Sequence, residues 1–161
     1  MKREKSAGAR PQERKFLGIS FTWQREPKRR MAPKAVRRFK EKVRERTRRT
    51  RGVSTERMAQ ELARYHKGWS GYFGKYQTPS VLEDLEKRSR CRLRSANWKQ
   101  WKRGRVRYAE LRKRGVGTVL AAQTVGSAHG PWRLADSSAL HFALPNAYFD
   151  ALGLPRLTVA R

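Results

Sequence analysis

Two stretches of the chain concentrate side chains that could bind phosphate. Residues 28–51 hold thirteen Lys and Arg against two carboxylates, and residues 87–114 hold thirteen against Glu110 alone. Lys and Arg bind phosphates through charge and, for Arg, through a planar fork of donors, with little demand on base sequence. The alternative is a solvated helix face, yet like charges four residues apart, such as Lys40 and Arg44, destabilise an isolated helix. We therefore predict that the first cluster binds phosphate.

The second cluster also interleaves aromatic rings with its cations. Trp98 and Trp101 lie three residues apart, hence on one face of a helix, beside Lys99 and Lys102. Flat rings next to cations can stack on unpaired bases, as in many single-stranded RNA sites. The same rings could instead be core anchors surrounded by charge. The two interpretations are compatible if one ring packs inside and the other is partly exposed.

The predicted RNA-contacting residues come from both clusters. In the first cluster they are Lys34, Arg37, Arg38, Lys40, Arg44, Arg48, Arg49 and Arg51. In the second cluster they are Trp98, Lys99, Trp101, Lys102, Arg103, Arg105, Arg107 and Tyr108.

Carboxylates that could support catalysis are sparse. Two-metal nucleotidyl transfer needs acidic side chains close enough to hold both ions. Asp84, Asp136 and Asp150 are far apart in the sequence, and no Asp-Asp pair occurs. The one acidic group, Glu83-Asp84 with Glu86, lies near the start of a predicted basic helix, where it suits the helix dipole and local ion pairs. We predict no catalytic residue.

The sequence also lacks a metal-binding pattern. Cys91 is the only cysteine, which excludes an intramolecular disulfide and a cysteine-based zinc site. The histidines His66, His129 and His141 do not have metal-ligand spacing. Cys91 is best interpreted as an ordinary helical residue, with a reactive thiol as the alternative. No metal and no cofactor are expected.

Charge dominates the composition. The 161 residues carry 40 Lys and Arg against 13 Asp and Glu, a formal net charge of +27. A folded domain this basic repels itself unless a polyanion neutralises it, so the expected partner is nucleic acid. Sixteen aromatic residues can still supply a lean core for one modest domain. No segment approaches eighteen apolar residues, so we expect a cytoplasmic protein that does not span a membrane.

The N-terminal third is predicted to contain a leader, a hairpin and a helix. Residues 1–15 are polar and are predicted to be a flexible leader. Residues 16–32 are predicted to form a β hairpin, because Ile19, Phe21 and Trp23 alternate with polar residues. A helix is predicted to begin at Pro33 and to end with Gly52 as its C′ residue.

Helical spacing continues beyond this point. Ser54 can cap a second helix, and Thr78-Pro79 opens a third that runs into Trp98 and Trp101. One face of the second helix is apolar, and its residues are Met58, Leu62, Tyr65, Trp69, Tyr72 and Phe73. This face predicts core packing, with a base-stacking platform as the alternative.

The remainder of the chain is predicted to form short helices and loops. A helix is predicted before Gly115, another over residues 117–125, a loop over residues 130–132, and a last short helix capped by Asn146. Past Leu134 the chain is nearly neutral, which predicts that this segment packs against the rest of the fold. The expected fold class is mainly α: a basic helical bundle preceded by a small β hairpin.

Several segments, in this order and spacing, resemble the C-terminal part of bacterial group II intron reverse transcriptase/maturases, over about residues 15–155. They are Phe16-Leu17-Gly18, Ala32-Pro33-Lys34, Thr47-Arg48-Arg49-Thr50-Arg51-Gly52, Gly68-Trp69-x-x-Tyr72-Phe73, Arg92-Leu93-Arg94, Trp98-Lys99-Gln100-Trp101-Lys102, Gly130-Pro131-Trp132 and Leu144-Pro145-Asn146-Ala147-Tyr148-Phe149.

The resemblance implies a division of the chain. Residues 16–32 would be the end of a reverse-transcriptase palm, residues 33–155 the helical thumb or maturase-specific domain, and residues 156–161 a tail. It also implies that Lys34 to Arg51 lie on a thumb helix facing nucleic acid, and that Trp98 to Arg107 belong to an RNA-contacting surface.

The function that the resemblance implies is binding of structured group II intron RNA to assist its folding and splicing. The family's catalytic Tyr-Ala-Asp-Asp segment does not occur in this sequence, so no polymerisation by this chain alone is expected. The chain would then be a truncated C-terminal part of such a protein, with a separately encoded reverse-transcriptase half as a possible partner. The alternatives are a general basic nucleic-acid-binding protein and the thumb fragment of a split RNA-directed DNA polymerase.

Overall fold

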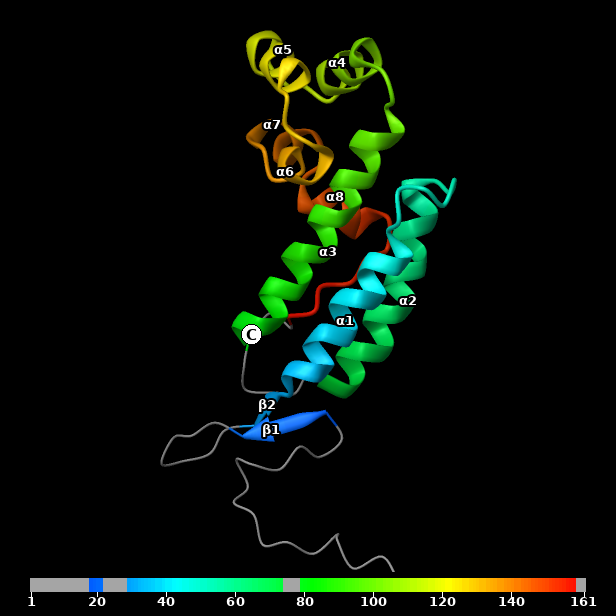
Figure 1. The fold of residues 1–161 in the computed structure, drawn as a ribbon, viewed down its shortest axis with the longest axis vertical. Helices are drawn as coiled ribbons and strands as arrows, with labels where there is room; N and C mark the ends of the chain where they lie inside the picture. The colour runs from blue at the N-terminus through cyan, green and yellow to red at the C-terminus, as the bar shows by residue number, and fades with distance from the viewer. Residues whose placement is uncertain (1–17, 22–28, 74–78, 159–161) are drawn as a thin grey trace, which may run out of the picture.

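The computed structural model describes residues 18–21, 29–73 and 79–158, and it is mainly helical (Figure 1). The two strands are β1 (Ile19–Phe21) and β2 (Arg29–Met31). The helices are α1 (Pro33–Arg46), α2 (Thr55–Phe73), α3 (Pro79–Gln100), α4 (Gly104–Lys113), α5 (Thr118–Gly126), α6 (Pro131–Leu134), α7 (Ser138–Ala143) and α8 (Asn146–Ala151). The predicted fold class, helical with a small N-terminal hairpin, is confirmed.

The hairpin is antiparallel and leads directly into α1. Ile19 pairs with Met31, and the Ala32 amide donates to the Gly18 carbonyl at 2.8 Å. Gly18 has φ +84°, and a side chain there would meet the Phe73 ring at 3.2 Å, so both conformation and space favour glycine. Other residues of the predicted hairpin, Trp23 among them, lie outside the described residues.

Helix α1 begins at Pro33 as predicted but ends at Arg46, so the prediction that Gly52 ends it is wrong. The hydroxyl of Thr47 donates to the Val43 carbonyl at 2.6 Å, and the guanidinium of Arg51 donates to the Arg46 carbonyl at 2.6 Å. These side chains satisfy carbonyls that a longer helix would have used. Gly52 does adopt a positive φ of 68°, but in the loop that follows.

An aromatic cluster joins α1 to α2. Phe39 of α1 lies 4.6 Å from Trp69 of α2, and Trp69 lies 4.7 Å from Phe73, measured between ring centroids. The side chain of Ser54 accepts a hydrogen bond from the Arg57 amide at 3.3 Å, as the predicted cap requires. The α2 face therefore packs in the core, as predicted, although Tyr72 at its end is 49 % exposed.

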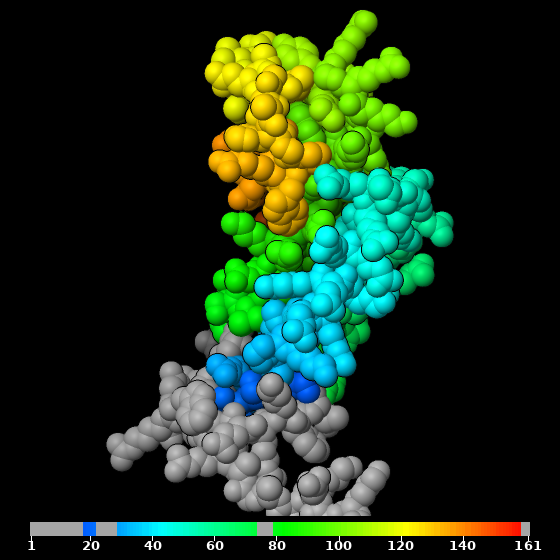
Figure 2. All heavy atoms as spheres, in the orientation of Figure 1, coloured from blue at the N-terminus to red at the C-terminus, as the bar shows by residue number. Residues whose placement is uncertain are grey.

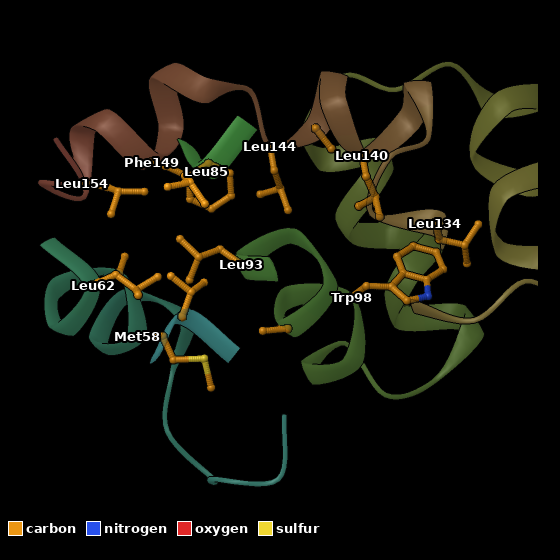
Figure 3. Packing of buried hydrophobic residues seen from close by; sticks show 14 of the residues in the cluster. Met58, Leu62, Leu85, Leu93, Trp98, Leu134, Leu140, Leu144, Phe149 and Leu154 are labelled. Carbon is orange, nitrogen blue, oxygen red and sulfur yellow. The ribbon is translucent and has the colours of Figure 1, made fainter. Parts of the chain in front are cut away.

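The C-terminal segments cover α3, the long central helix. Gly130-Pro131-Trp132, predicted to be a loop, instead begins α6, with Pro131 in the first turn where it is tolerated. The chain past Leu134, called the tail from here on, packs in the core as predicted. Figure 3 shows its apolar residues around those of α2 and α3: Leu134, Leu140, Leu144, Phe149 and Leu154 beside Met58, Leu62, Leu85, Leu93 and Trp98.

Two arginines of α3 are buried and hold α8 in place. Arg90, 1 % exposed, donates to the Asp150 carboxylate at 2.7 Å, to the Asn146 carbonyl at 2.8 Å and to the Glu86 carboxylate at 3.2 Å. Arg94, 2 % exposed, donates to the Leu144 carbonyl and to the Asn146 side-chain oxygen, both at 2.9 Å. These cations of the second cluster are structural.

We expect Arg90→Ala to lower the free energy of unfolding by about 3 kcal/mol, because it leaves the carboxylates of Asp150 and Glu86 without their shared partner. Denaturant titration monitored by circular dichroism measures this. Lys87→Ala removes an exposed charge from the same helix and should change stability by no more than about 0.5 kcal/mol. Equal effects of the two substitutions would contradict the structural role of Arg90.

His66 makes stability depend on pH. It is fully buried, its Nε2 lies 3.2 Å from the Ser89 hydroxyl, and burial lowers its pKa from 6.5 to about 4. The unfolded chain therefore binds more protons between these values, so the contribution of His66 is complete above pH 6.5 and falls as pH drops towards 4.

We expect this loss to be on the order of 3 kcal/mol between pH 7 and pH 4. His66→Gln, which keeps a polar group near Ser89 but does not titrate, should lack it. Unfolding free energies of both proteins measured across this range test the assignment. Parallel pH curves for wild type and variant would refute it.

Candidate nucleic-acid interface

The first basic cluster covers the outer surface of α1. Phe39 and Val43 occupy the buried positions of this helix, so its cations project from the remaining faces. Five predicted contact residues are exposed there: Lys34, Arg37, Arg38, Lys40 and Arg44. In the described part of the chain only Arg37 of these five has an ion-pair partner, Glu41, at 4.0 Å and in solvent. This surface, cyan in Figure 2, therefore carries charge that the protein itself leaves largely uncompensated.

The end of the cluster lies in a loop rather than on the helix. Arg48 and Arg49 are exposed in this loop. Arg51 binds the Glu61 carboxylate with two donors, at 2.8 and 3.2 Å, and this hydrogen-bonded pairing lowers the pKa of Glu61. The Arg51 guanidinium thus holds the loop to α2 and caps α1, which leaves Arg48 and Arg49 as the outward cations.

Trp98 and Trp101 are core residues. Trp98 is 1 % exposed and Trp101 is 8 % exposed, and their rings meet edge to face with 6.0 Å between centroids. Arg107 of α4 lies over the Trp98 ring at 4.8 Å, and Arg114 lies over the Trp101 ring at 5.1 Å. The core-anchor interpretation therefore holds, and the prediction that these rings stack on bases does not. Arg107 is likewise engaged in packing.

The other predicted contact residues of the second cluster face solvent around the turn between α3 and α4. Lys99, Lys102, Arg103 and Arg105 are exposed, and Tyr108 is 37 % exposed. Long side chains from this part of the chain extend beyond the body of the molecule at the top of Figure 2.

Gln100 fixes the two clusters beside each other. Its side-chain nitrogen donates to the Val53 carbonyl at 2.8 Å, and its oxygen accepts from the Thr55 hydroxyl at 2.9 Å. These bonds tie the end of α3 to the loop that carries Arg48 and Arg49. The segments that carry these cations, α1, this loop and the α3–α4 turn, are all visible on the face shown in Figure 2.

The structure adds a groove that the sequence analysis missed. It has a volume of about 1020 Å³, and residues of α1, of α3 and of α6 with its flanking segments line it. Its residues include Lys40, Lys87, Arg88, Trp132 and Arg133. These positions are up to ninety residues apart, so no local pattern unites them. Gly130-Pro131-Trp132 contributed only to the family resemblance.

Two further observations concern the described residues as a whole. They contain no group of three or more His, Cys, Asp and Glu side chains that could hold a metal ion. None of their helices combines the length and the apolar character needed to cross a bilayer.

Comparison with protein families gives a match over about half of the chain. Residues 36–115, from α1 through the turn after α4, match the family described as group II intron, maturase-specific domain. No curated protein matches the chain significantly. The matched segment contains both basic clusters apart from the first residues of the first one, together with the helices that support them. Through residues 36–115, this chain belongs to the group II intron maturase-specific domain family.

Proposed function

We propose that this chain binds group II intron RNA and assists its folding and splicing, without itself catalysing a reaction. The observation that carries the proposal is the uncompensated charge on α1 and the following loop, within a segment that matches the maturase-specific domain. RNA binding accounts for the charge, and the family match names the class of RNA.

The electrostatics favour binding through phosphates. At physiological ionic strength the Debye length is about 8 Å, so salt does not fully screen the repulsion between neighbouring exposed cations along α1. A bound polyanion neutralises this repulsion. Backbone phosphates are recognised by charge and position, so folded RNA would be read through its shape. The rigid placement of the loop by Arg51 and Gln100 supports such reading, because it fixes the spacing between cations.

Part of the proposal concerns a partner. We propose that β1 and β2 represent the end of a reverse-transcriptase palm and that a separately encoded reverse-transcriptase half could complete it. In the described residues the sheet has two strands, and Ile19 and Phe21 are only half-buried. A two-stranded sheet is marginal alone, and further strands would cover these side chains.

We expect Arg38→Gln and Arg48→Gln each to weaken binding to group II intron RNA and to reduce the slope of log affinity against log salt by about 0.7–0.9, since each removes one phosphate contact. Filter binding across salt concentrations measures both effects, and the same proteins can be assayed for assistance of intron splicing. Lys67→Gln removes an exposed charge from α2 and is the matched control. A salt slope that falls equally in all three variants would show that total charge, rather than this surface, determines binding.

A further inference from the structure

The groove between α1, α3 and α6 differs from the exposed basic surface in having an aromatic ring. Trp132, in the first turn of α6, is 42 % exposed and lines the groove. Its neighbours Pro131 and Leu134 set its position, because Pro131 starts the helix and Leu134 is buried in the core. In Figure 2 the orange segment that contains α6 lies across from cyan α1 on the same face.

Two arginines of α3 lie against this ring. The guanidinium carbons of Arg88 and Arg92 lie 5.6 and 5.1 Å from the Trp132 ring centre. Cation–π contacts of this kind hold the indole in place and make its surroundings positive. Trp132 therefore presents a partly exposed, fixed aromatic surface, unlike the buried rings of Trp98 and Trp101.

Like charges accumulate beside the ring without an internal anion. Burial, Arg88, and then Arg44 and Arg49 together lower the pKa of Arg92, the direction that neighbouring positive charges impose on an arginine. None of these four arginines forms an ion pair within the described residues. The Nε atoms of Arg88 and Arg92 are also buried without a hydrogen-bond acceptor there.

Neighbouring arginines on the same helix have a different environment. Arg90 and Arg94 point to the tail, and each donates hydrogen bonds to oxygen atoms. The acceptors are carboxylate, carbonyl and amide oxygens. The carboxylates that line the groove are Asp84, which is exposed, and Asp136, which lies 3.1 Å from His141 Nε2. The lining cations, Lys40, Lys87, Arg88 and Arg133, outnumber these two carboxylates, so the groove is suited to an external anion.

We propose that this groove holds an unpaired RNA nucleotide, with its base on Trp132 and its phosphate at the lining cations Lys40, Arg88 and Arg133. The inference rests on the proposed function and names a subsite of it. A phosphate matches these cations, and a base matches the partly exposed ring. The groove volume is at the upper end of the roughly 300–1,000 Å³ range of small-ligand sites, which is ample for one nucleotide. Duplex RNA would not fit this pattern, because its bases stack on one another.

The test compares two probes with the full chain: a short labelled oligoadenylate, and a ribose-phosphate chain of equal length that lacks bases. Wild type should bind the oligoadenylate about 5–150-fold more tightly, the effect of one base on an aromatic ring. Trp132→Ala should abolish this preference and leave affinity for the base-free chain unchanged, whereas Trp132→Phe should retain most of it. Lys40→Gln, which removes an exposed cation that lines the groove, should weaken both probes.

Phe142→Ala is the matched control, because it removes a 61 % exposed aromatic side chain of α7 that does not line the groove. Circular dichroism checks folding of each variant. The proposal is overturned if wild type binds both probes equally, if Trp132→Ala keeps the base preference, or if Phe142→Ala loses it as well.

Binding to group II intron RNA is measured separately, so that the two proposals can fail independently. A base preference that depends on Trp132, in a protein that does not select intron RNA, would support the groove and refute the proposed function. Selection of intron RNA without a base preference would refute the groove alone.

Discussion

A helix with an arginine at every second position from Arg88 to Arg94 can form the centre of a fold only if its inward cations find partners. Helix α3 meets this constraint by dividing its arginines. Arg90 and Arg94, four residues apart, point to the tail and donate to oxygens of α8 and of the residues before it. The tail is therefore held by buried hydrogen bonds to charge, as well as by its apolar residues.

The other pair on α3 has a different environment. Arg88 and Arg92, again four residues apart, lie against the Trp132 ring. Both pairs on α3 therefore have partners within the fold, oxygen atoms for one pair and an aromatic ring for the other. Elsewhere, Arg51, Arg107 and Arg114 are engaged in packing or capping while Arg48, Arg49 and Arg103 face solvent. Net charge alone does not identify which arginines can contact RNA.

Local patterns predicted the parts of the fold that depend on local rules. Alternation in the strand, proline at the start of α1 and the Ser54 cap all placed elements correctly. The end of α1 was missed because the side chain of Arg51, in the loop that follows, donates to the Arg46 carbonyl, and residue spacing does not reveal that contact. Trp98 and Trp101 were ambiguous because burial depends on the return of α4, which places Arg107 and Arg114 over their rings. The groove could not be predicted, since its three walls come from separate segments.

Uncompensated cations on α1 and on the loop that Arg51 and Gln100 hold in place are proposed to select group II intron RNA. Competition binding of the full chain tests this selection most directly, with labelled intron RNA against duplex DNA and an unrelated structured RNA at about 150–200 mM salt, where nonspecific contacts weaken. The account predicts that the intron is preferred by about tenfold or more. Equal binding to all three would contradict it and would reduce the function to that of a general basic nucleic-acid-binding protein.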